Sequence, residues 1–184
     1  MTTAMLYRLS LVAAATLVAA CSDKTPLGPS GRSAIAPPAA NRQSDEVVNP
    51  DLEQALAAMR AATAPYHDIQ NALNDGFALR ITCLAPGEDE LVGDIYTNRT
   101  RARDGKIDPS LPDGLIYEPT PDGPRLVGVE LIMPYALWTN PDPPTFFGHE
   151  FRREDGPGVY GLHVWIWRHN PDGMFEEANP NVKC

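Results

Sequence analysis

The hydrophobic periodicity of the chain changes at Asp75-Gly76, and this change constrains the fold more than any other feature. Before it, apolar residues follow the spacing of one helical face: Leu52, Leu56, Met59, Ala62, Tyr66, Ile69, Leu73 and Phe77. Asn49-Pro50 supplies a capping side chain and a proline at the first helical position, where no amide donor is needed. Pro65 interrupts the run, because proline cannot donate the helical hydrogen bond. The pattern predicts two helical segments, near residues 50–63 and 66–75.

After Gly76 the chain carries short runs rich in β-branched and aromatic residues, which are typical of strands. Clusters of Pro, Gly, Asp and Asn separate these runs, which are Phe77–Cys83, Leu91–Tyr96, Leu115–Glu118, Leu126–Met133 and Val159–Arg168. Pro-Asp-Gly at 112–114, 121–123 and 171–173 indicates turns, because the spacing of the acidic residues does not fit an EF-hand calcium loop. In the tightest hairpin, Glu118 is expected opposite Arg125. The order of elements predicts an α+β domain, with two N-terminal helical segments packed on one face of a small antiparallel β-sheet and long Pro/Gly-rich loops.

The first residues have the pattern of an export signal. One positive charge, Arg8, precedes an apolar run over residues 9–20, which is shorter than the roughly 20 residues that cross a bilayer. Val18-Ala19-Ala20-Cys21 resembles a lipobox, the signature of bacterial lipoproteins. The resemblance implies that residues 1–20 are a cleaved signal peptide and that Cys21 is lipidated, so that a membrane is a partner through this anchor. An ordinary secretory signal that contains a cysteine is the alternative.

The segment 21–49 is expected to be the lipidated cysteine and a flexible tether, because it is rich in Ser, Thr, Pro and Gly and has no apolar periodicity. A single globular domain would then span residues 50–184. The formal net charge of −9 disfavours nucleic acid as a partner, and also direct contact of the domain with anionic headgroups. The expected location is the cell envelope, outside the cytoplasm. Ser22 favours the outer membrane, because some lipoproteins retained at the inner membrane carry aspartate there.

Cys83 and Cys184 remain as a pair once Cys21 is assigned to lipid. An exported domain lies in an oxidising compartment, where such a pair is expected to form a disulfide. The bridge would close a loop of about 100 residues and stabilise the fold by up to about 5 kcal/mol in the chain-entropy model. A metal-binding thiolate or a free thiol are the alternatives, but the local spacing of Cys-x-x-Cys is missing.

Strand alternation separates aliphatic from polar and aromatic faces. The aliphatic faces, expected under the helices, are Val127, Val129, Leu131 and Met133 on one strand and Leu162, Val164 and Ile166 on another. The opposite faces carry Glu130 on the first strand and His163, Trp165 and Trp167 on the second. If the two strands share a sheet, Glu130, Trp165 and Trp167 would line an aromatic-walled ligand site, which the connection 134–156 could cover. Alternatively, the tryptophans form a second small core and His163 is a core histidine bonded to backbone.

The candidate metal ligands are His163, His149 and Glu150, because nitrogen and carboxylate ligands suit zinc or another divalent ion. Glu130, together with Asp94 or His67, could complete such a set. A His–Glu pair could equally act as general acid and base. The sequence contains no His-Glu-x-x-His, Gly-x-Ser-x-Gly or glycine-rich phosphate loop. His149-Glu150 could instead be solvated loop residues.

From Tyr66 onward, about two-thirds of the domain resembles an uncharacterised family of secreted and lipoprotein-type bacterial domains. The motifs that carry the resemblance are Asp75-Gly76-Phe77, Leu115–Pro119, Leu126–Glu130, Leu162–Trp167, Asn170–Phe175 and Asn179–Cys184. The resemblance implies export and a chain that ends on a cysteine. It also implies that a histidine is common in the stretch where Asp94 stands here.

The first expectation for function is a membrane-tethered envelope domain that binds a small molecule or a protein and is not an enzyme. A small metal-dependent hydrolase with a His/Glu site is the second expectation, with zinc as its candidate cofactor. A purely structural envelope protein is the third.

Overall fold

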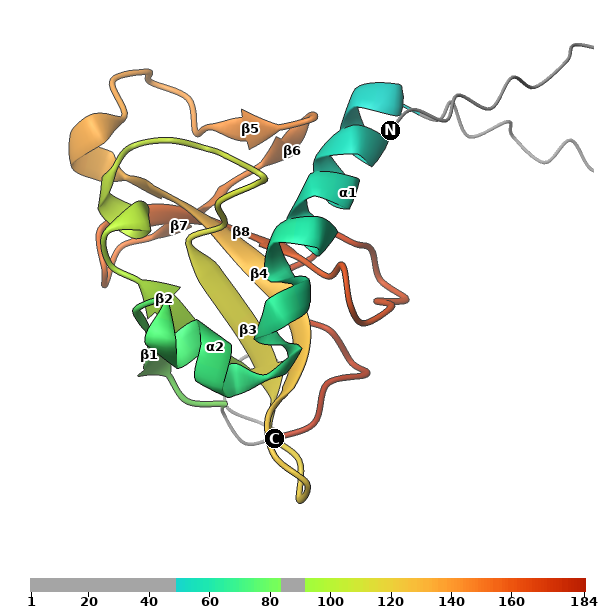
Figure 1. The fold of residues 1–184 in the computed structure, drawn as a ribbon. Helices are drawn as coiled ribbons and strands as arrows, with labels where there is room; N and C mark the ends of the chain where they lie inside the picture. Colours follow the sequence, from blue (N-terminus) through green and yellow to red (C-terminus); the bar gives the residue numbers. More distant parts are fainter. Residues whose placement is uncertain (1–48, 84–91) are drawn as a thin grey trace, which may run out of the picture. The chain divides into compact units, whose positions relative to one another are not determined.

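The computed structural model describes residues 49–83 and 92–184, which belong to one unit spanning Glu46–Cys184. The helices are α1 (Pro50–Thr63) and α2 (Ile69–Asn74), with 3-10 turns η1 (Ala64–His67), η2 (Arg101–Arg103) and η3 (Tyr135–Leu137). The strands are β1 (Phe77–Ile81), β2 (Asp94–Asn98), β3 (Gly114–Glu118), β4 (Arg125–Pro134), β5 (Thr145–Phe146), β6 (His149–Glu150), β7 (Arg152–Glu154) and β8 (Val159–Val164). The class expected from the sequence, an α+β domain with an antiparallel sheet, is confirmed (Figure 1).

The expected signal peptide, the expected lipidation of Cys21 and the tether up to residue 48 lie outside the described residues. Among the helices of the described part, none combines the length and the apolar character needed to cross a bilayer.

Local sequence explains where the helices begin and break. The side chain of Asn49 accepts hydrogen bonds from the backbone N–H groups of Asp51 and Leu52, at 3.1 and 3.3 Å, and so caps α1. The chain tightens into η1 around Pro65, and Asp68 then caps α2 by accepting from the N–H of Gln70 at 2.9 Å. The helical stripe is therefore split into two short helices, as a proline inside the pattern requires.

The main sheet has the strand order β1-β2-β3-β4-β8-β7, and every neighbouring pair is antiparallel. Strands β5 and β6 form a separate two-stranded sheet. Glu118 pairs with Arg125 across the β3–β4 hairpin, and their side chains form an ion pair at 3.5 Å, so the predicted register is confirmed. Strands β4 and β8 are neighbours, with Glu130 opposite His163.

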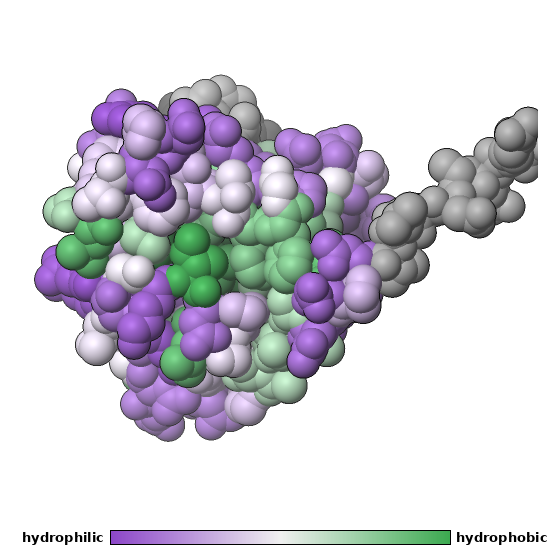
Figure 2. Space-filling model, turned by 90° about the horizontal axis from the view of Figure 1, so that it is seen from above, coloured by the Kyte–Doolittle hydropathy of each residue, from purple (hydrophilic) through white to green (hydrophobic). Residues whose placement is uncertain are grey.

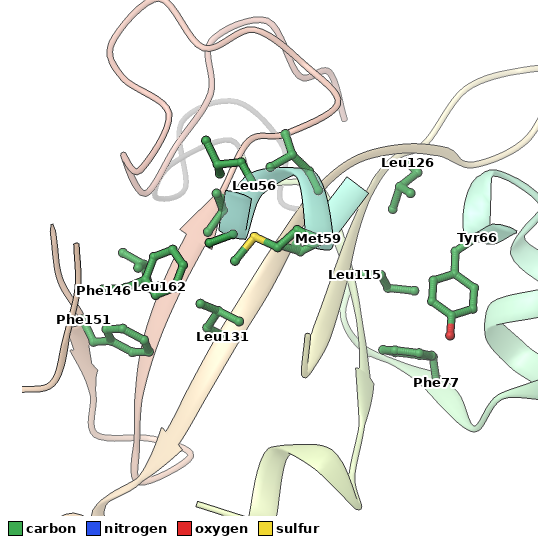
Figure 3. Close-up of a cluster of buried hydrophobic side chains, with 14 of the residues drawn as sticks. Leu56, Met59, Tyr66, Phe77, Leu115, Leu126, Leu131, Phe146, Phe151 and Leu162 are labelled. Carbon is green, nitrogen blue, oxygen red and sulfur yellow. The ribbon is translucent and has the colours of Figure 1, made fainter. Parts of the chain in front are cut away.

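The main hydrophobic core lies between the helices and one face of the sheet (Figure 3). Leu56 and Met59 of α1 belong to it together with Leu131 of β4 and Leu162 of β8. Burial of large aliphatic and aromatic side chains of this kind stabilises a fold by about 1.5–3 kcal/mol each. The helices thus occupy one face of the sheet and leave the opposite face for other elements.

Two side chains lie on a different face from the one that the sequence predicted, and one of them belongs to a smaller core on the opposite face of the sheet. Between Ile116 and Tyr117 the β3–β4 register shifts by one residue, and Val127 is left without a partner on β3. This bulge turns Val127 away from the helices, into a cluster with Ile116, Trp165 and Val182, whereas we expected it under the helices. Trp167, expected on the same face as His163, instead packs on the main core, because β8 ends at Val164 and strand alternation no longer applies.

A disulfide joins Cys83 to Cys184 with a Cα–Cα distance of 5.4 Å, as the cysteine count predicted. The last residues are also held by packing: Val182 is fully buried, and the N–H of Lys183 donates to the buried carboxylate of Glu118 at 3.1 Å. The C-terminal segment therefore covers the smaller core and forms part of the folded domain.

Some large apolar side chains stay at the surface: Leu73, Leu79, Ile81, Leu111, Leu137 and Phe147. Seen from above the view of Figure 1, apolar surface gathers in the middle of that face and polar side chains surround it (Figure 2). Exposed apolar surface is ordinary for globular domains and is not by itself a binding site.

Candidate functional site

A cavity of about 490 Å³ opens on the sheet face opposite the helices. Its walls come from β1, β2, the turn η2, β4, β7 and the start of β8. We call it the carboxylate cavity, because Glu130 of β4 and Glu154 of β7 line it. Its volume lies in the range of small-molecule sites in proteins, about 300–1,000 Å³.

Two glycines make room for the carboxylates. Thr97, Gly114, Glu130 and His163 are successive partners in one row across β2, β3, β4 and β8. A Cβ atom on Gly114 would lie 2.6 Å from Oε2 of Glu130, which is closer than real contacts allow. Gly161 has the same role on β8, where a Cβ would collide with the Glu154 carboxylate and lie 3.4 Å from Oε1 of Glu130. The two carboxylates therefore converge over Gly161.

Burial shifts the protonation of these acids. Glu130 is 4% exposed, and burial raises its pKa well above the usual value, with further increases from the nearby charges of Glu154, Asp113 and Glu177. Burial also raises the pKa of Glu154, which the charge of His163 partly offsets. Raised carboxyl pKa values in a cavity are typical of functional sites, because buried acids are costly to keep for structure alone.

His163 lies behind Glu130 and is itself buried. Its Nδ1 is 2.8 Å from the backbone carbonyl oxygen of Glu177, and since a carbonyl can only accept, Nδ1 carries the proton of this bond. Nε2 then faces Oε1 of Glu130 at 4.0 Å, which is an electrostatic contact and too long for a hydrogen bond. One nitrogen of the ring is thus bonded to backbone, as in the core histidine that we considered as an alternative. The other nitrogen faces Glu130.

Three arginines, Arg80, Arg99 and Arg103, line the same cavity and are exposed to solvent. None of the three guanidinium groups forms a hydrogen bond or an ion pair with any residue in the described part of the chain. The cavity therefore combines a buried acidic floor with a cationic mouth. Guanidinium groups bind planar anions such as carboxylates with two parallel hydrogen bonds.

The predicted aromatic-walled site is arranged differently. Trp165 is 2% exposed in the smaller core, and its indole N–H donates to the carbonyl of Glu176 at 2.6 Å. Trp167 lies on the helix side, where its N–H donates to Thr63 at 3.0 Å. Of the described side chains that line the carboxylate cavity, none is aromatic. Of the three residues that the sequence predicted for a ligand site, Glu130 lines this cavity.

The candidate metal ligands lie in separate surroundings. His149 is exposed on β6, where its ring stacks on Phe175 with centroids 3.9 Å apart, and Glu150 is exposed beside it. Asp94 accepts the N–H of Cys83 at 2.7 Å, and the ring of His67 packs against Trp167. Over residues 49–83 and 92–184, no group of three or more His, Cys, Asp or Glu side chains is arranged to hold a metal ion. The set His163, His149 and Glu150 is therefore not brought together.

Sequence reasoning missed Glu154 and the three arginines of the mouth. Glu154 lies in the connection 134–156, which we expected to be a cover, yet its Phe146 and Phe151 are buried in the main core and its end forms strand β7. The alternation of arginine at positions 99, 101 and 103 was the available signal. It could not be interpreted without knowing that β1 and β7 are the two edges of one sheet.

Comparison with known proteins returned no similarity to this chain: no family model, no curated protein and no solved structure matches it.

Proposed function

We propose that this domain binds a small molecule in the carboxylate cavity and that Cys21 anchors it to the membrane of the cell envelope. The observation that carries the proposal is the cavity itself, in which Glu130 is buried at the floor while three arginines that pair with no described residue line the mouth. The expectation of a binding domain is kept, and its site moves from the tryptophans to this cavity.

The energetics of the cavity support a ligand. A buried carboxyl group with a raised pKa lowers the stability of the fold at neutral pH, and packed apolar residues would be a more stable filling. Gly114 and Gly161 leave the space that the two carboxylates occupy beside the cavity, and any larger residue at either position would displace them. An open cavity with costly polar groups is what a binding site requires and what a structural core avoids.

Acetate is a suitable first probe, because it carries the planar anion that guanidinium groups recognise. In ¹H–¹⁵N spectra of the domain, acetate should shift the backbone amides of β2 and η2, around Thr97 and Ala102. The double substitution Arg99→Gln and Arg103→Gln should weaken this binding by about tenfold or more, since each charge-assisted bond contributes on the order of 1.5 kcal/mol.

Arg60→Gln is the matched control, because Arg60 lies in the last turn of α1 and does not line the cavity. This variant should bind acetate as the unsubstituted protein does. Shifts scattered over the surface and unchanged in the double variant would mean that the cavity has no binding role, and the structural-protein alternative would then be favoured.

The anchor is tested by cell fractionation. The full chain should partition into the membrane fraction, and Cys21→Ser should release it, because a lipoprotein needs its acylated cysteine to stay on the membrane. Substitution of both Cys83 and Cys184 by serine is the control, since it leaves Cys21 intact. Separation of inner and outer membranes tests the expectation of the outer one. A Cys21→Ser protein that stays on the membrane would contradict the anchor.

A further inference from the structure

We propose that the ligand of the carboxylate cavity is a small zwitterion, with its ammonium group between Glu130 and Glu154 and its acid group at Arg80, Arg99 and Arg103. This inference rests on the proposed binding function and adds the chemical class of the ligand. Three features of the cavity carry it: the acidic groups of the floor, the convergence of the two carboxylates over Gly161, and the charge of the mouth.

The floor has more acidic than basic groups. Glu130 is surrounded by the carboxylates of Glu154, Glu177 and Asp113, all of which disfavour its ionised form. His163 is the basic group nearest to it, at 4.0 Å, and the other nitrogen of the ring is bonded to a backbone carbonyl. The guanidinium of Arg152 lies 3.6 Å from the Glu177 carboxylate, and its charge, like that of His163, also favours the ionised form of Glu154. A cation supplied from outside would therefore favour the ionised form of Glu130, which its burial and the neighbouring carboxylates disfavour.

The geometry suits a small cation with several donors. Oε1 of Glu130 and Oε1 of Glu154 both approach the position that a Cβ of Gly161 would occupy. The two carboxylates thus meet over a residue without a side chain. An ammonium group has three N–H donors and can bond to both acids at once, whereas the described residues offer no three-ligand set for a metal ion here.

The arginines at the mouth of the cavity favour a negatively charged group on the ligand. Arg80, Arg99 and Arg103 make no bonds to described residues, so their donors are available. An anion without an amine would gain from the arginines but place nothing on the acidic floor. A cation without an acid group would meet three positive charges at the entrance. A ligand with both charges satisfies both ends.

Calorimetry with ω-amino acids tests the inference. The probes are glycine, β-alanine, 4-aminobutyrate and 6-aminohexanoate, whose increasing length measures the span from floor to mouth. Butyrate and butylamine are the matched controls, because each lacks one of the charged groups. At least one amino acid should bind about tenfold tighter than both controls, the difference expected for one charge-assisted contact.

Two further readouts separate a specific ammonium site from general attraction. Binding of the ammonium should ionise Glu130 and Glu154, so the measured heat should differ between buffers of different protonation enthalpy and reveal proton release. Glu154→Gln should abolish the preference of the amino acid over butyrate and leave butyrate binding unchanged. Glu53→Gln on α1 is the control, since Glu53 is exposed and does not line the cavity.

The outcomes distinguish the two proposals. Equal binding of butyrate and every amino acid, without proton release, would overturn the zwitterion and leave the binding function in place. If neither acetate nor any amino acid binds, the proposed function fails, and the zwitterion fails with it. Tight binding of one amino acid that Glu154→Gln reduces to the level of butyrate would support both.

Discussion

Replacing Cys184 by serine should lower the free energy of unfolding by up to about 5 kcal/mol, the largest effect expected for a single substitution in this domain. The disulfide to Cys83 spans 101 residues, and a crosslink over so long a loop removes much of the conformational entropy of the unfolded chain. The substitution also frees the C-terminal segment, so that the buried Val182 and the bond from Lys183 to Glu118 lose their anchor.

Urea denaturation of the domain measures this effect. Cys83→Ser and the double variant should unfold at the same low urea concentration as Cys184→Ser, because all three remove one and the same bond. Cys21→Ser, made in the full chain, is the control: it replaces a cysteine outside the described residues, and it should leave the unfolding midpoint of the domain unchanged. An unfolding midpoint of the double variant equal to that of the unsubstituted protein would show that the bridge contributes nothing.

Replacing Asp113 by asparagine should stabilise the domain at pH 8 by on the order of 2–4 kcal/mol and have little effect at pH 4. Burial raises the pKa of Asp113 from 3.8 to about 7, although its Oδ2 accepts the N–H of Ile132 at 2.7 Å. A change of that size disfavours the ionised form by on the order of 4 kcal/mol. Asparagine keeps an acceptor for Ile132 and carries no charge to bury.

The direction in which stability changes with pH follows from the protons that Asp113 binds in the folded and the unfolded state. Because the pKa of Asp113 is higher in the folded than in the unfolded protein, the folded state holds the extra proton between pH 3.8 and about 7. Stability is therefore full below this window, falls as the pH rises through it, and stays low above it. Urea midpoints of the protein and the variant should converge at acidic pH and separate at pH 8.

Asp122→Asn is the matched control, since Asp122 is exposed in the turn between β3 and β4 and should show no such pH dependence. A stabilisation by Asp113→Asn of the same size at both pH values would contradict a charge effect and indicate a change in packing.

Much of the fold was predictable because its determinants are local or few. The helix start at Asn49-Pro50 and the break at Pro65 depend on groups within one turn of the chain. The register of Glu118 with Arg125 depends on one short loop. The disulfide follows from counting cysteines, since one pair remains after Cys21 is set aside.

The wrong prediction for Val127 shows the limit of predicting side-chain directions from strand alternation. An alternating pattern places side chains correctly only while the strand keeps its register, and a single unpaired residue reverses all that precede it. Val127 therefore points away from the helices while Val129 and Leu131 point towards them. The glycine next to Val127, Gly128, is the one local signal, since glycine inside a strand often marks a bulge, but it does not say which neighbouring residue is left unpaired.

The sequence by itself determined the first helix, the five longer strands in outline, the turn chemistry and the paired cysteines, which follow from short-range geometry or simple counting, whereas strands β5, β6 and β7 and the start of α2 at Ile69 were not predicted. Only the tertiary structure decided the carboxylate cavity, whose charged residues come from β1, the turn after β2, η2, β4 and β7. These elements are brought together because the strands join one sheet in the order β1-β2-β3-β4-β8-β7, which places residues far apart in the chain along one cavity. Such pairings are stabilised by contacts between residues far apart in the chain, which local periodicity does not encode.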